Sequence, residues 1–340
     1  MQSERPVTII TWNILANELL LYLWRGSYGL EIRADGNTDI GRAYYNNIHR
    51  MRINNIIERL REYDADIICL QETTNVEYEY LGGKTTQKYI ADAMGYEVVS
   101  NSYKNNPFTC NYPPYEQRFR GLASQQLSMD SGVSTLLKTA GAAITANVKL
   151  VRNIATANSF PASVVFGKGS GSPFTLDKFI IKGFEFNIVN VHIKMEYPSI
   201  INPVKEVFDR ISQRLTPHEL VKTIVMGDFN AGAARASIEL KESPFNEEMT
   251  DINREKFIDD HVFVGNNINR DNNVKIRYIE DISILEMNVN MPVLDKKWKG
   301  PIAVQDYNQS EINNRLIYGQ PIEAGMVTSD HYPIRIEFSI

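Results

Sequence analysis

The stretch TSDHYPIRIEF, residues 328–338, leads from a polar turn into a closing strand. In its second half, isoleucine, isoleucine and phenylalanine alternate with charged residues, which is the period of a half-buried β-strand. The adjacent pair Asp330 and His331 stands directly before that strand. We therefore expect both side chains at the edge of a β-sheet, where they face a cleft.

Other apolar runs upstream also end in polar residues that suit catalysis. Asn13 follows the N-terminal run, and Glu72 and His192 follow two more. The turn GDFN at residues 227–230 follows a fourth. Each run predicts a strand, so these polar residues come at strand ends. If Asn13 and Asp330 share one site, the first and last strands of the chain lie close together.

Five such strand ends in this order resemble the endonuclease/exonuclease/phosphatase superfamily, which includes deoxyribonuclease I. The resemblance spans residues 7–338. It implies an α/β fold, a four-layer α/β/β/α sandwich in which two packed mixed sheets are flanked by helices, with the site at the top between the sheets. The order of elements agrees, since strands outnumber helices and both come in two clusters, which favours two sheets packed face to face.

Chain length and the placement of the polar residues favour different domain counts. A chain of 340 residues suggests about two domains. The expected meeting of the first and last strands instead favours one domain over residues 1–340. Within it, insertions are expected near residues 14–46, 101–131 and 265–320.

The composition is that of an ordinary globular protein, with 43% hydrophobic and 23% charged residues. A net charge of -5 and the lack of a basic tail count against a protein that coats DNA, but not against an enzyme with a small basic patch and a metal. We find no signal peptide and no run long enough to span a bilayer, so we expect an intracellular protein, cytoplasmic or nuclear. Cys69 is expected in the core, and nothing supports a disulfide with Cys110.

Several helices and strands can be placed along the chain. Residues 47–63 predict a helix with apolar side chains on one face and charged ones, Arg52 among them, mostly on the other. Residues 85–94 predict a second helix, which Gly95 ends. Further strands are predicted at residues 132–137, 141–148, 179–181 and 184–193.

The resemblance implies a Mg²⁺ site, with Mn²⁺ as an alternative ion. Glu72 is the principal candidate ligand, because a carboxylate at a strand end can hold Mg²⁺ while the ion keeps waters for a substrate phosphate. In the family, the residue matching Asn13 assists on the same ion or its waters. Asp330 would be a further carboxylate on the metal side. Whether one ion or two bind stays open.

The resemblance also implies the catalytic groups. Asp228 would orient or deprotonate the attacking water, and Asn230 would steady the phosphoryl oxygens. His192 matches a histidine found in the deoxyribonuclease I, sphingomyelinase and deadenylase branches. His331 matches the histidine that faces the phosphate.

His331 is expected to be oriented by an aspartate from the segment IDDHVFV at residues 258–264. The match to the family favours Asp260. Asp259 is the alternative, because a slip of one residue in register reverses the face of a strand.

The N-terminal blocks narrow the resemblance to one branch. TWNILA at residues 11–16 and DADIICLQE at residues 64–72 are most similar to the deadenylase, nocturnin and 2′-phosphodiesterase group. We therefore expect a Mg²⁺-dependent phosphodiesterase or nuclease that hydrolyses nucleic acid or nucleotides with a metal-activated water. The alternatives are an inositol-lipid phosphatase or sphingomyelinase-type phosphoesterase, and an inactive binding module on the same scaffold. DNA or RNA, endonuclease or exonuclease action, and oligomeric state stay open.

Overall fold

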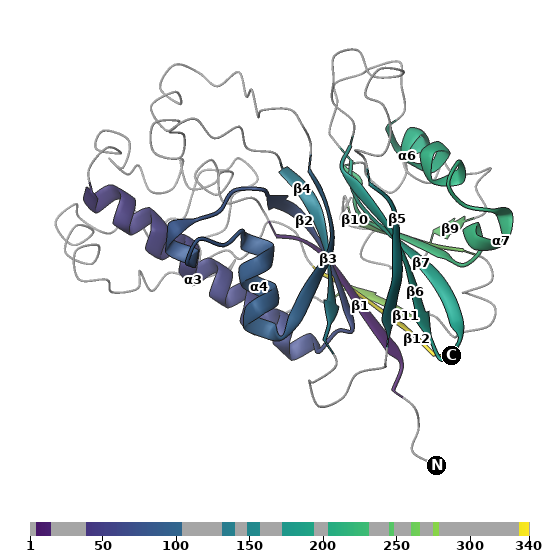
Figure 1. Cartoon of the computed structure of the whole chain (residues 1–340), viewed down its shortest axis with the longest axis horizontal. Coiled ribbons are helices and arrows are strands. Elements are labelled where there is room, and N and C mark those ends of the chain that lie inside the picture. Colours follow the sequence, from purple (N-terminus) through teal and green to yellow (C-terminus); the bar gives the residue numbers. More distant parts are fainter. Residues whose placement is uncertain are drawn as a thin grey trace.

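Two β-sheets lie face to face in the computed structural model of the chain (Figure 1). The structure describes residues 5–14, 39–103, 131–139, 148–156, 172–193, 203–230, 245–247, 260–265, 275–278 and 333–339. The first sheet contains, in spatial order, β11 (Lys275–Tyr278), β12 (Ile334–Phe338), β1 (Val7–Asn13), β2 (Ile67–Thr74), β4 (Ser131–Lys138) and β3 (Tyr96–Tyr103). The second contains β5 (Lys149–Thr156), β6 (Phe174–Ile181), β7 (Phe184–His192), β8 (Thr223–Asp228), β10 (Asp260–Gly265) and β9 (Phe245–Glu247).

Both sheets are mixed. In the first sheet, β1 runs parallel to β2 and antiparallel to β12. In the second, β7 runs parallel to β8 and antiparallel to β6. Ile9 of the first strand lies opposite Ile336 of the closing strand, so the two ends of the sequence pattern meet as expected. The closing strand also shows the expected alternation, since Ile334, Ile336 and Phe338 are buried.

Helices cover the outer face of each sheet (Figure 1). α3 (Asp39–Tyr63) and α4 (Thr86–Met94) lie on the first sheet, where the short helical turn η1 (Glu79–Leu81) precedes α4. α6 (Pro203–Ser212) and α7 (Pro217–Leu220) lie beside the second sheet. Leu60 of α3 and Trp12 of β1 belong to one buried cluster, and the ring of Phe208 of α6 contacts that of Phe263 of β10. The predicted α/β/β/α sandwich is confirmed.

The space between the sheets holds an apolar core. Alternate side chains of both sheets meet there, among them Ile9, Cys69, Ile188, Met226 and Ile336. Cys69 is a free thiol in this core, as expected. Because every second side chain on a strand shares a face, β1, β7 and β8 deliver their last side chains from this inner face. The last side chains of these three strands therefore all point into the space between the sheets.

α3 differs from the prediction in length and in one side chain. It begins at Asp39 rather than near residue 47. Arg52, expected among the charged residues of the outer face, is completely buried. Its Nη1 donates a 2.5 Å hydrogen bond to the carbonyl oxygen of Ile14, directly after β1 ends. The prediction that Arg52 lies on the charged outer face was wrong. Burial of this long cationic side chain is tolerated because the Ile14 carbonyl oxygen accepts its hydrogen bond.

α4 agrees with the prediction. Its N-cap residue Thr85 accepts a hydrogen bond from the backbone N–H of Lys88. Gly95 ends the helix in a left-handed conformation, with φ of 75°. The antiparallel pair predicted around residues 182–183 is present as β6 and β7.

Some predicted segments fall outside the described residues. They include residues 141–147 of one expected strand and most of the insertions near 14–46, 101–131 and 265–320. β5 was not predicted, because half of its residues are exposed and its sequence gives no apolar alternation. Among the described residues, no helix is long and apolar enough to cross a membrane.

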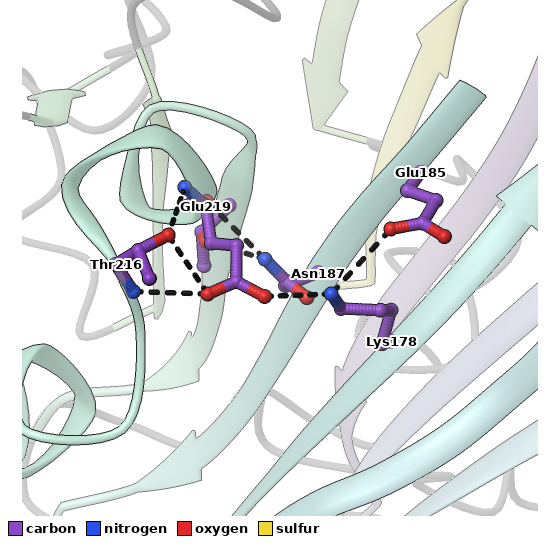
Figure 2. Close-up of polar contacts among 6 residues, drawn as sticks. Lys178, Glu185, Asn187, Thr216 and Glu219 are labelled. Carbon is purple, nitrogen blue, oxygen red and sulfur yellow. Dashed lines mark hydrogen bonds and ion pairs between the residues drawn. The ribbon is translucent and has the colours of Figure 1, made fainter.

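A charged cluster fixes α7 against the second sheet (Figure 2). Glu219 and the N-cap residue Thr216 form a reciprocal capping box at the start of α7. The Glu219 carboxylate also accepts a 2.6 Å hydrogen bond from Lys178 Nζ of β6. The same nitrogen lies 3.5 Å from Glu185 Oε2. Hydrogen bonds from Lys178 and Thr216 hold the pKa of Glu219 at about 2, below its ordinary value of 4.5.

Candidate active site

Most of the predicted site residues lie at one end of the sandwich. Asn13, His192 and Asp228 are the last residues of β1, β7 and β8. In the second sheet, His192 lies opposite Asp228, and Asp228 lies opposite Asp260. Asp260 begins an antiparallel strand, so it belongs to the same end.

The Asn13 side chain joins the two sheets at this end. Its Nδ2 donates a 3.1 Å hydrogen bond to Glu72 Oε1 in the first sheet. The same nitrogen donates a 2.8 Å hydrogen bond to Asp228 Oδ2 in the second. Asn13 and Asp228 are both buried. A buried amide therefore sets the separation of the two carboxylates.

His192 lies beside both carboxylates. Its Nε2 is 3.5 Å from Asp228 Oδ2 and 3.9 Å from Glu72 Oε1. The His192 side chain is 14% exposed and that of Glu72 10%, whereas Asp228 is 1% exposed. His192 and Glu72 thus keep part of their side chains exposed, whereas Asp228 is buried.

Glu72 reaches the site through an irregularity in β2. Strand alternation would place its side chain on the face opposite that of Gln71, away from the inner face. The pairing of β2 with β4 shifts register between Gln71 and Thr73, and Glu72 has a φ of 58°. A bulge with a left-handed residue turns that side chain to the other face of the strand. For a residue other than glycine, the left-handed conformation costs about 1–3 kcal/mol of conformational energy. The bulge accounts for the contact between Glu72 and Asn13.

The GDFN turn holds Asp228 in a fixed orientation. Gly227 has a φ of 136°, and a Cβ there would lie 2.1 Å from the Val191 carbonyl oxygen, so only glycine fits against β7. The backbone N–H of Asn230 donates a 2.8 Å hydrogen bond to Asp228 Oδ1. The Asn230 side chain donates a 2.7 Å hydrogen bond to the Ile193 carbonyl oxygen. Asn230 therefore supports Asp228, and its expected contact with a phosphoryl oxygen stays a prediction.

Three residues named from the sequence, Asp259, Asp330 and His331, lie outside the described residues. The roles of Asp330 on the metal side and of His331 facing the phosphate therefore stay predictions. Asp260 is buried in the expected strand beside Asp228. The choice between Asp259 and Asp260 as the partner of His331 stays open.

The donor set fits a divalent metal ion. Glu72, His192 and Asp228 each offer one ligand atom, and these atoms lie within 4.8 Å of one another. Two sheltered carboxylates this close repel each other unless a cation or hydrogen bonds offset their charge. Carboxylate oxygens suit Mg²⁺ and Mn²⁺, and imidazole suits transition ions. The grouping contains Glu72, the principal ligand predicted from the sequence, together with His192 and Asp228, for which the sequence indicated catalytic roles. The role of Glu72 as a metal ligand stays a prediction.

Two buried amide side chains beneath the site, Gln71 and Asn190, were not predicted from the sequence. Gln71 Nε2 donates a 2.7 Å hydrogen bond to Asn190 Oδ1, from the first sheet to the second. One signal was present, because Asn190 stands two positions before His192 and so shares its strand face. The spacing between Asn190 and His192 does not show that Asn190 has a hydrogen-bond partner, Gln71, on the other sheet.

Two carboxylates, an amide and a histidine gathered between two packed sheets are the set of groups that the resemblance to the deoxyribonuclease I-like hydrolases implied. The family model described as "Endonuclease/Exonuclease/phosphatase family" matches residues 10–331. The chain belongs to this family, whose members are hydrolases that act on phosphoester bonds. The resemblance predicted from the sequence is confirmed.

Solved structures with similar folds include the mannosyl-6-phosphatase Bt3783 of Bacteroides thetaiotaomicron VPI-5482. The match has 13% identity and a TM-score of 0.51, and covers 98% of this chain and 100% of that one. An endonuclease/exonuclease/phosphatase family protein from Leptotrichia buccalis C-1013-b gives 13% identity, a TM-score of 0.50, and coverage of 98% and 100%. Identities this low show the fold alone. No sequence among curated proteins matches this chain significantly.

Proposed function

We propose that the chain is a Mg²⁺-dependent phosphodiesterase that hydrolyses nucleic acid or nucleotides. One observation carries the proposal: Asn13, Glu72, His192 and Asp228 converge from both sheets on one point. We place this activity in a single domain over residues 1–340.

Glu72 would be the first ligand of the metal, and His192 and Asp228 of the second sheet would turn their donor atoms to the ion or to the waters it keeps. Asn13 orients the Glu72 carboxylate through the 3.1 Å hydrogen bond, and Asp330 is the further ligand predicted on the metal side. When bound, Mg²⁺ or Mn²⁺ supplies positive charge beside the phosphate and favours deprotonation of water.

Asp228 would accept the proton of the attacking water. Its Oδ1 takes the N–H of Asn230 and its Oδ2 takes the amide of Asn13, so the carboxylate is held in one orientation. As the water oxygen bonds to phosphorus, the bond from phosphorus to the leaving oxygen breaks, and the leaving oxygen keeps the electron pair and takes up a proton from solvent. A positioned base of this kind contributes about 10²–10⁴-fold to the rate.

His192 would donate a hydrogen bond to a phosphoryl oxygen. Its imidazole is partly exposed and lies beside both carboxylates. A donor placed where negative charge accumulates stabilises the transition state more than the substrate. His331 is expected to share this role.

The proposed substrate class rests on the blocks at residues 11–16 and 64–72. They resemble the branch that cuts RNA or nucleotide phosphodiesters. With a net charge of -5, attraction of a polyanionic substrate must come from the local site rather than from the whole surface.

The test is a substrate panel with purified protein. It compares cleavage of labelled single-stranded RNA, single-stranded DNA, duplex DNA and bis-nitrophenyl phosphate, with Mg²⁺, with Mn²⁺ and with EDTA. We expect at least one substrate to be cleaved with metal and none with EDTA, and the preferred polymer assigns the branch.

Folded protein that cleaves none of these substrates would contradict the nuclease proposal. Phosphoinositides and sphingomyelin would then test the lipid alternative. Protein that is inactive on all of them would support the inactive binding module instead.

A further inference from the structure

The candidate site is divided between the two sheets. Asn13 and Glu72 belong to the first sheet, whereas His192 and Asp228 belong to the second. Backbone hydrogen bonds set the geometry within each sheet. The geometry between the two pairs depends on how one sheet sits on the other, and apolar packing between them is not directional. Asn13 makes one directional contact across the sheets, to Asp228, and a second one close to the site would fix the offset further.

Asn190 of β7 supplies such a contact. Its Oδ1 accepts the 2.7 Å hydrogen bond from Gln71 Nε2 of β2. Its Nδ2 donates to two backbone carbonyl oxygens, those of Leu70 at 3.2 Å and Ser134 at 3.1 Å. Leu70 and Ser134 lie opposite each other in the pairing of β2 with β4. One side chain from the second sheet therefore holds two adjacent strands of the first.

Burial makes this contact specific for one arrangement of the sheets. Asn190 and Gln71 are both completely buried. A buried polar group that loses its partner costs about 1–3 kcal/mol. Sliding either strand by one residue would break several of these hydrogen bonds at once, so the network selects a single offset.

We infer that Asn190, together with Gln71, is a positioning residue for the candidate metal site. Gln71 directly precedes Glu72 at the bulge, and Asn190 stands two positions before His192 on the same inner face. The amide pair holds Glu72 at a fixed offset from His192 and Asp228. This inference rests on the proposed function and adds the residues that set the ligand geometry between the sheets.

A second contact between the sheets offers a matched control. Ser100 Oγ of β3 donates a 2.5 Å hydrogen bond to Asp177 Oδ2 of β6. Asp177 lies opposite Ile188, whereas Asn190 lies opposite Thr175. The control contact is therefore one inner-face position farther from the strand end that carries His192. Ser100 and Asp177 are buried, like the amide pair.

The experiment measures Mg²⁺ and Mn²⁺ binding by titration calorimetry for wild type, Asn190→Ala, Gln71→Met and Ser100→Ala. Circular dichroism and urea unfolding establish that each variant is folded and how much stability it has lost. We expect Asn190→Ala and Gln71→Met to weaken metal affinity by about 10–100-fold, as is typical for residues that orient metal ligands. Ser100→Ala should lose stability and keep the wild-type affinity.

Wild-type affinity in folded Asn190→Ala and Gln71→Met would overturn the inference and leave the proposed function standing. An equal loss of affinity in Ser100→Ala would also overturn it, because the effect would then be a general loosening of the sheets. If Asn190→Ala does not fold, Gln71→Met decides, since methionine keeps the length of the side chain. Wild-type protein that binds neither ion would overturn the proposed function and this inference together.

Discussion

Asn13 donates a 2.8 Å hydrogen bond to Asp228 across the sheet interface, although 215 positions separate the two residues in the chain. Each residue ends a strand, and the strands belong to different sheets. The same amide nitrogen also reaches Glu72. One buried side chain therefore gathers both carboxylates of the candidate site, and each carboxylate can be tested for a separate role.

Glu72→Gln should weaken Mg²⁺ binding by at least about tenfold. The substitution keeps the shape of the side chain and removes the negative charge that would hold the cation. Titration calorimetry with Mg²⁺ or Mn²⁺ measures the effect. Glu97→Gln, an exposed carboxylate on β3 of the same sheet, is the control. Unchanged affinity in Glu72→Gln would place the metal elsewhere.

Arg52→Met should destabilise the protein by about 1–3 kcal/mol, the scale of a hydrogen bond from a charged donor. Methionine leaves the Ile14 carbonyl oxygen without its partner at the point where the chain leaves β1. Urea unfolding measures the change. Arg50→Met, an exposed position on the same helix, should change stability by less than about 0.5 kcal/mol. Equal effects of the two substitutions would refute the role of the buried guanidinium.

Asp177→Asn should raise stability at neutral pH. Burial raises the pKa of the Asp177 carboxyl, although hydrogen bonds from Ser100 and Asn153 oppose the shift. The native protein therefore holds this proton more tightly than the unfolded chain does. Its stabilising effect is complete at acidic pH and is lost as pH rises through the raised pKa.

Urea unfolding between about pH 4 and pH 8 tests this linkage. Asp177→Asn should flatten the pH dependence of the unfolding free energy, because the titrating group is gone. Glu97→Gln should leave the wild-type slope. A slope in Asp177→Asn equal to that of wild type would mean that another group produces it.

Glu219→Gln should destabilise the protein at neutral pH and remove part of its loss of stability in acid. The pKa of Glu219 is held at about 2, so its stabilising effect is present above the ordinary value of 4.5 and is lost as pH falls between the two. The carboxylate is partly exposed, so we expect at most about 1 kcal/mol. Urea midpoints at neutral and acidic pH measure it, and an equal deficit at both would contradict the linkage.

Four residues of the candidate site could be picked out from the sequence because each follows an apolar run, although Glu72 lies at a bulge within β2 rather than at its end. Asn13, Glu72, His192 and Asp228 were found in this way without any knowledge of contacts. The same reasoning was wrong for Arg52. Helical periodicity assigns a residue to a face, but it does not show that a strand end places a carbonyl oxygen within reach of a long side chain.

Contacts between the sheets could not be predicted from periodicity. Gln71 and Asn190 are 119 positions apart, and the sequence around each residue does not indicate that they form a hydrogen bond with each other. Glu72 is a further example, because strict alternation would direct it away from the site. Its position depends on a bulge, and that bulge arises from the pairing of β2 with β4.

The central claim is that Asp228 is the base of a metal-dependent phosphodiesterase. The most direct test is the single-turnover cleavage rate with Mg²⁺, on the best substrate of the wild-type protein, for wild type, Asp228→Asn and Glu97→Gln. The proposed mechanism predicts a loss of at least about 10²-fold in folded Asp228→Asn and the wild-type rate in Glu97→Gln. A folded Asp228→Asn variant that cleaves as fast as wild type would contradict it.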